Sequence, residues 1–97
     1  MIFSKLYLYK FLVEYLISII FFYVVISDGT AIAIGSAQAL AIFVGRIIST
    51  GDVYYNPAAT VMMTVAGKLP LYDLLPYIVC QVSGSLTALG IYKYIKL

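Results

Sequence analysis

The chain has 97 residues, of which 64% are hydrophobic and 10% are charged, and its net charge is +2. Soluble domains average roughly 45–50% apolar and about 25% charged residues, and small ones bury little surface, so this composition excludes a soluble fold. The basic residues occur singly, which excludes a nucleic-acid-binding surface. We therefore expect a single domain over residues 1–97 that is embedded in a lipid bilayer as an integral, multi-pass membrane protein.

The residue types present also argue against an enzyme or a metal site. The chain has one cysteine and no histidine, so it offers neither a multi-thiolate metal site nor a histidine-dependent active site. Its acidic side chains are far apart in the sequence, at positions 14, 28, 52 and 73. We predict that the protein is not an enzyme, has no catalytic residues and needs no cofactor or metal.

The first apolar segment covers residues 6–27 and is closed by a polar turn at residues 28–30. It is long enough to cross a bilayer, which takes about 17–25 residues. Glu14 falls inside this span. An acidic side chain at membrane depth indicates a functional role or a structural pairing.

The second span is expected at residues 30–50. Small residues recur along it at every fourth position, at Ala33, Ala37, Ala41 and Gly45. This spacing places them on one face of a helix, where a neighbouring helix can pack closely in lipid. The alternative is an alanine-rich helix without a specific partner.

Residues 57–67 form an apolar segment that is too short to cross the membrane. A helix of this length rises about 16 Å, near half of a hydrocarbon core of about 30 Å. A helix lying on the membrane surface would need a charged face, and this segment has no charged residue. The segment is therefore predicted to be a re-entrant half-helix.

The third span is predicted at residues 71–92, with Pro76 in its first turns. Gln81 and Ser85 are polar residues within it. They lie beside a second set of small residues at four-residue spacing, Cys80, Gly84 and Ala88. The sequence thus predicts an all-α membrane protein with three transmembrane helices and one re-entrant half-helix.

The tripeptide Asn56-Pro57-Ala58 marks the start of the half-helix. Asn is a preferred N-cap, and Pro suits the first helical position because its missing N–H has no intrahelical partner there. A re-entrant helix that starts at mid-depth points its free N–H groups and its positive dipole end into the membrane interior. The Asn56 amide could then donate hydrogen bonds to a water or hydroxyl. The alternative is an ordinary Asn-Pro turn between two spans.

Four stretches of the chain resemble the first half of the major intrinsic protein (aquaporin) family. They are Glu14-Tyr15-Leu16, Asn56-Pro57-Ala58-Ala59-Thr60-Val61, Gly67-Lys68-Leu69-Pro70-Leu71 and Tyr77-Ile78-Val79-Cys80-Gln81-Val82-Ser83-Gly84. The resemblance implies a half-domain with three spans and one re-entrant half-helix. It also implies that Glu14 is a buried acid that braces the loop backbone, and that Gln81 is the buried polar residue of the last span.

The chain departs from the family pattern in three respects. Family members carry an inverted repeat with a second Asn-Pro-Ala motif, which we expect to be absent here. The narrow filter of the family uses an aromatic residue and an arginine; counting without gaps, Ser36 stands at the aromatic position and Ala59 follows the motif in place of arginine. Tyr54 stands where the family usually has histidine.

The resemblance implies a channel subunit for water or small neutral solutes that works as an oligomer. We expect an antiparallel dimer, since two copies related by a two-fold axis in the membrane plane would rebuild the inverted repeat. In that arrangement Asn56, Pro57, Ala58, Ser36 and Ala59 line the pore, and both sets of small residues offer faces for contact between copies. A complementary half is the other candidate partner. The alternatives are a non-conducting fragment that pairs with a full-length channel and, more weakly, a transporter subunit.

Overall fold

The computed structural model describes residues 5–49 and 53–95. It contains the helices α1 (Lys5–Ser27), α2 (Ala31–Ser49), α3 (Pro57–Val65) and α4 (Leu71–Gly90), and α4 continues into a π-helical turn, η1 (Ile91–Ile95). The predicted all-α architecture of three long helices and one short helix is confirmed. Three helices are apolar and long enough to cross a membrane, over Leu8–Ser27, Ala31–Ser49 and Leu71–Ile95.

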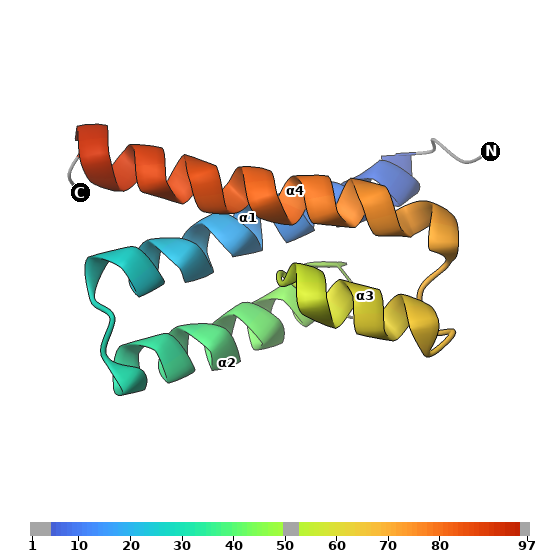
Figure 1. Cartoon of the computed structure of the whole chain (residues 1–97), viewed down its shortest axis with the longest axis horizontal. Helices are drawn as coiled ribbons and strands as arrows, with labels where there is room; N and C mark the ends of the chain where they lie inside the picture. Colours follow the sequence, from blue (N-terminus) through green and yellow to red (C-terminus); the bar gives the residue numbers. More distant parts are fainter. Residues whose placement is uncertain (1–4, 50–52, 96–97) are drawn as a thin grey trace.

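The helix α1 is the central element of the molecule. It packs against both α2 and α4, while α3 packs against α4 (Figure 1). The three long helices run along the 40 Å axis of the molecule, whereas α3 starts near the middle of that axis and ends where α4 begins (Figure 1). This is the path of a re-entrant segment, which enters to mid-depth and returns to the end from which it came.

The half-helix ends at Val65, two residues earlier than the sequence predicts. Gly67 adopts a φ of +81°, and the N–H groups of Gly67 and Lys68 donate to the carbonyls of Thr64 and Met63, at 3.1 and 2.9 Å. This is the Schellman arrangement, in which a left-handed residue closes a helix and satisfies its last carbonyls. Ala66 is therefore the C-cap, and Gly67 lies beyond the helix.

Both sets of small residues pack inside the chain. On α2, Ala41 and Gly45 are buried, and Ala41 belongs to a core cluster with Val13 and Ile17 of α1. On α4, Gly84 and Ala88 are buried, and a Cβ at Gly84 would lie 2.6 Å from the Ser18 Cβ atom. The prediction of close-packing faces is confirmed at these four residues, whereas a contact between copies through the half-buried Ala33, Ala37 and Cys80 stays a prediction. Ala41 and Gly84 pack against α1, and Gly45 packs against Val53 of the loop before α3.

An ion pair joins α1 and α4 at the end of the molecule where both helices begin. The Lys10 ammonium binds the carboxylate of Asp73, which is fully buried in the first turn of α4. The same ammonium lies 5.4 Å from the centre of the Phe11 ring and 5.9 Å from that of the Tyr77 ring. The sequence analysis placed no pair here, because 63 residues separate the two partners.

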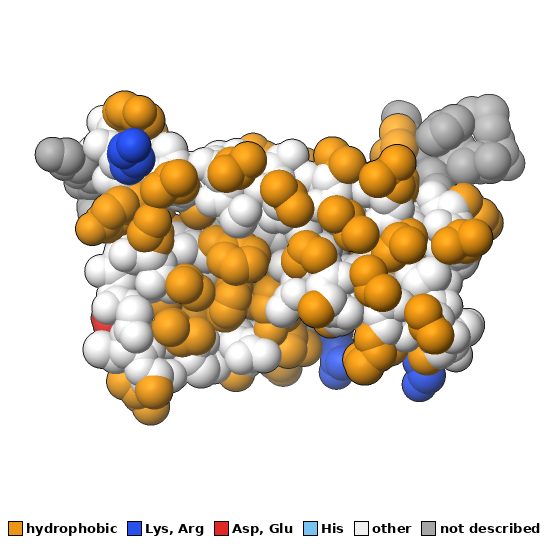
Figure 2. Space-filling model, in the orientation of Figure 1, with side chains coloured by type: hydrophobic (Ala, Val, Ile, Leu, Met, Phe, Trp, Pro, Cys, Tyr) orange, Lys and Arg blue, Asp and Glu red, His pale blue; other side chains and the backbone are white. Residues whose placement is uncertain are grey.

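The outer surface is dominated by apolar side chains. Figure 2 shows hydrophobic side chains across most of one face, with the few basic side chains at its margins. Large exposed side chains occur on every helix, among them Ile20, Ile32, Phe43, Val65 and Leu75. A surface of this kind is stable in lipid rather than in water, because lipid does not penalise exposed apolar area.

Candidate functional site

The candidate site is built around the start of α3. Asn56 is the N-cap, with extended backbone angles of −130° and 123°, and its Oδ1 accepts the Ala58 N–H at 2.8 Å. Pro57 occupies the first helical position, where its missing N–H costs nothing. The predicted helix start is therefore present, and the cap holds the Asn56 side chain in one orientation.

The acceptor groups of Asn56 are occupied within the chain. Its carbonyl oxygen accepts both the N–H and the hydroxyl of Thr60, each at 3.0 Å. Its Nδ2 has no acceptor among the residues that the structure describes, and the residue is exposed. Asn56 therefore presents a hydrogen-bond donor to whatever lies outside this helix start.

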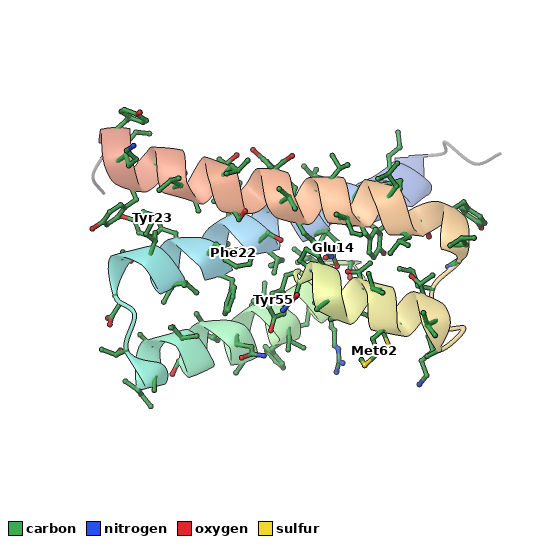
Figure 3. All side chains as sticks on the ribbon, in the orientation of Figure 1. Glu14, Phe22, Tyr23, Tyr55 and Met62 are labelled. Atoms are coloured by element: carbon green, nitrogen blue, oxygen red, sulfur yellow. The ribbon has the colours of Figure 1, made fainter. Side chains whose placement is uncertain are left out.

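The Glu14 carboxylate fixes the backbone that leads into the half-helix. Glu14 is 1% exposed. Its Oε2 accepts the Tyr54 N–H at 2.8 Å, and its Oε1 accepts the Tyr55 N–H at 2.7 Å. Figure 3 shows Glu14 on α1, with Tyr55 close to the start of α3. Two consecutive N–H groups that converge on one anion form the concave arrangement with which backbones bind anions.

Tyr55 has an unusual backbone conformation at this point. Its φ is +41°, in the left-handed region that a bulky residue rarely adopts. The Tyr55 ring is buried, and its centre lies 4.9 Å from the centre of the Phe21 ring. The strain is local and is held by the bond to Glu14 and by this packing.

Gln81 connects the carboxylate to the half-helix. Its Nε2 donates to Glu14 Oε1 at 3.0 Å and to the Thr60 hydroxyl at 2.7 Å. Gln81 and Thr60 have no exposed surface. One buried network thus ties α1, α4 and α3 together, and both residues that the sequence marked as buried polar groups, Glu14 and Gln81, belong to it.

The remaining predicted site residues lie apart from this network. Ala58 is exposed beside Asn56, whereas Ala59 is half-buried and packs against a cluster of Tyr54, Leu69 and Tyr77. Ser36 is exposed on α2. It precedes Ala41, which packs in one cluster with Val13 and Ile17 of α1, by five residues, about 1.4 helical turns, so it lies on a different side of α2 from that contact. The roles of Ser36 and Ala59 in a pore constriction stay predictions.

The sequence analysis missed Thr60. The sequence feature that could have identified Thr60 is its position four residues after the N-cap. A threonine at that position can donate its hydroxyl hydrogen to the Asn56 carbonyl one turn earlier. No sequence pattern indicated the left-handed conformation of Tyr55. A non-glycine residue is held there only by tertiary contacts that are distant in the sequence.

Comparison with known proteins identifies the family. The sequence profile of the major intrinsic protein family matches residues 12–97. The chain belongs to this family. With its three apolar helices of spanning length, it is an integral, multi-pass membrane protein.

Curated relatives match the chain over part of their length. Aquaporin Z of Brucella melitensis is 45% identical over 64 residues, which are 65% of this chain and 27% of the relative. The glycerol uptake facilitator protein of Streptococcus pneumoniae is 40% identical over 52 residues, 54% of this chain and 21% of the relative. Glycerol uptake facilitator protein-like 6 of Lactiplantibacillus plantarum is 36% identical over 67 residues, which are 67% of this chain and 31% of the relative. No solved structure matches the chain.

Proposed function

We propose that this major intrinsic protein chain is a subunit of a membrane channel for water or small neutral solutes. The observation that carries the proposal is the start of α3, where an exposed Asn56 offers its amide hydrogens while its own acceptors are engaged. A donor of this kind binds the lone pairs of a water or hydroxyl oxygen. The positive end of the α3 dipole lies at the same point and disfavours cations.

The pore is expected to form only when a second element covers the start of α3. An exposed polar helix start at mid-depth would lie unsatisfied in hydrocarbon, which costs several kcal/mol per group. Two copies in opposite orientations would bring two α3 starts together at the midplane. Since Ala41 and Gly45 of α2 and Gly84 and Ala88 of α4 are buried within the chain, the contact would involve the exposed side of α3. That side carries Ala58, Val61, Met62 and Val65.

A second candidate function is a non-conducting fragment that pairs with a longer channel of the same family. The segments matched to curated relatives cover only 21–31% of those proteins. A partner that supplies a complementary half would cover the start of α3 as well as a second copy would. This candidate predicts binding without permeability of its own.

Water permeability of liposomes that contain the purified chain tests the proposal. We expect osmotic swelling faster than in protein-free liposomes. We also expect Asn56→Ala to lower the permeability added by the chain by roughly fivefold, the factor for about 1 kcal/mol of lost hydrogen bonding. The control is Leu75→Met, an apolar exchange at an exposed position of α4, outside the proposed contact through α3. Liposomes that swell no faster than empty ones would reject the channel and favour the paired fragment.

The orientation of the copies is tested separately with a reporter tag fused after Leu97. The antiparallel pair requires tags on both sides of the membrane. Tags on one side only would reject the two-fold arrangement and leave a complementary half as the partner.

A further inference from the structure

The buried network contains one residue whose role neither the sequence analysis nor the family comparison assigns. Thr60 lies on α3, has no exposed surface and bonds with two partners from different parts of the chain. Its hydroxyl accepts from Gln81 of α4 and donates to the carbonyl of Asn56. It therefore joins α4 directly to Asn56, which is exposed at the start of α3.

The direction of every hydrogen bond in this network is fixed. The Glu14 carboxylate accepts from Tyr54, Tyr55 and Gln81, so Gln81 presents its NH₂ group to it. The second hydrogen of the same NH₂ group goes to Thr60. The Thr60 hydroxyl must accept it, and its own hydrogen is left for the Asn56 carbonyl.

The other end of the Gln81 amide supports the same interpretation. Gln81 Oε1 is buried and meets no donor among the described residues. Burying an oxygen without a donor costs free energy. The two hydrogen bonds that the NH₂ group donates offset this cost, and they keep the amide in the observed orientation. A reversed amide would place its oxygen against the carboxylate and leave the NH₂ group without an acceptor.

We propose that the Thr60 hydroxyl is a positioning group of the pore, which transmits the orientation of Gln81 to Asn56 and keeps the Asn56 amide aimed at the solute. The link to permeation rests on the proposed channel function, whereas the link to Gln81 does not. Hydrogen bonds in such a chain polarise one another, so the bond to the Asn56 carbonyl weakens when the bond from Gln81 is lost.

The matched control lies one turn further along the same helix. The Thr64 hydroxyl donates to the Thr60 carbonyl at 2.8 Å, the same local bond that Thr60 makes to Asn56. Among the described residues, Thr64 makes no side-chain hydrogen bond to another helix. Removing each hydroxyl in turn therefore separates the connection to Gln81 from the effect of a threonine on its own helix.

The experiment compares Thr60→Val, Thr60→Ser and Thr64→Val with the parent chain by two measurements. The first is solvent exchange of the Gln81 side-chain NH₂ resonance by NMR in micelles, and the second is water permeability per chain in liposomes. We expect Thr60→Val to speed this exchange roughly five- to tenfold, because a buried donor loses its acceptor. Permeability should fall by a similar factor. Thr60→Ser keeps the hydroxyl and should match the parent in both, as should Thr64→Val.

The outcomes separate this proposal from the channel proposal. Parent-like NH₂ exchange in Thr60→Val would overturn the positioning role whether or not the chain conducts. Faster exchange with unchanged permeability would overturn the link to the pore. A parent chain that does not conduct would reject the channel, while the exchange measurement would still decide the connection between Thr60 and Gln81. If Thr60→Val does not assemble, Thr60→Cys replaces it. Because a thiol is a weaker acceptor than a hydroxyl, its exchange rate and permeability should lie between those of the parent and those expected for the valine variant.

Discussion

The Glu14 carboxylate is buried, and its oxygens accept hydrogen bonds from two backbone N–H groups and one side-chain amide. Those donors come from the loop before α3 and from α4, so one side chain on α1 determines how both are placed. Charge-assisted hydrogen bonds of this kind are roughly twice as strong as neutral ones. The carboxylate is structural here, since all three donors belong to the same chain.

Replacing Glu14 by alanine should destabilise the folded chain by about 1–3 kcal/mol, because the N–H groups of Tyr54 and Tyr55 lose their acceptor in a dry environment. The measurement is an unfolding titration in detergent. Tyr15→Phe is the control at the neighbouring position, where only the 2.7 Å bond to the Thr87 hydroxyl is lost. That single neutral bond should cost about 0.5–1.5 kcal/mol. A Glu14→Ala chain as stable as the parent would show that the carboxylate is not what holds the loop.

At the scale of the helices, the crossing of α1 and α4 depends on the absence of a side chain at Gly84. A Cβ atom there would lie 2.6 Å from the Ser18 Cβ atom and 2.8 Å from the backbone oxygen of Tyr15. Backbone cannot move aside as the end of a flexible side chain can. The two helices therefore approach each other as closely as they do only because this residue is glycine.

Gly84→Ala should destabilise the chain by about 1–3 kcal/mol through overpacking. Gly90→Ala on the same helix is the control, because a Cβ there meets nothing within 4 Å. The control should be neutral or stabilising by up to about 1 kcal/mol, since alanine favours a helix over glycine. Equal effects of the two substitutions in the same unfolding titration would contradict the close crossing.

Much of the architecture could be predicted from the sequence because it depends on local properties. The lengths of the apolar segments determine which helices cross the membrane, and Asn56-Pro57 marks a helix start through its own capping chemistry. The partners of Gly84 and Lys10 could not be predicted, because each lies on another helix that is distant in the sequence. Four-residue spacing shows that a face packs closely, but it does not show against what.

In the candidate site, Glu14 and Gln81 could be identified because polar side chains at membrane depth are rare and are paired or functional where they occur. Thr60 could not be identified in this way, because the hydroxyl of a threonine in a helix usually donates its hydrogen bond to a backbone carbonyl of the same helix. The strained Tyr55 could not be foreseen either. Its φ of +41° is imposed by the carboxylate of another helix and not by its own preferences.

At the scale of the whole molecule, the half-helix divides the chain into a part that reaches mid-depth and a part that returns to the surface. Ala58 lies at the start of α3, and the exposed Lys68 lies beyond its end. The two positions therefore differ in depth by roughly the length of the half-helix, although only ten residues separate them.

Cysteine labelling in a Cys80→Ala background tests this geometry. A cysteine at Ala58 should react slowly with a membrane-impermeant thiol reagent, because it lies in the membrane interior. A cysteine at Lys68 should react quickly, and only from the side at which α4 begins. Rapid reaction at both positions would mean that α3 lies on the membrane surface, and the re-entrant fold would be wrong.

The connections of Glu14 also determine the order in which the fold can be completed during synthesis. Its backbone donors follow 40 and 41 residues later in the chain, and Gln81 follows 67 residues later. At about 5–20 residues per second, a ribosome needs roughly 3–13 seconds to add those 67 residues. During that interval α1 already exists with a carboxylate that lacks at first all of its donors and then the Gln81 amide. The nascent α1 must wait where water or the insertion machinery can solvate Glu14, and its stable burial in lipid is coupled to the arrival of α4.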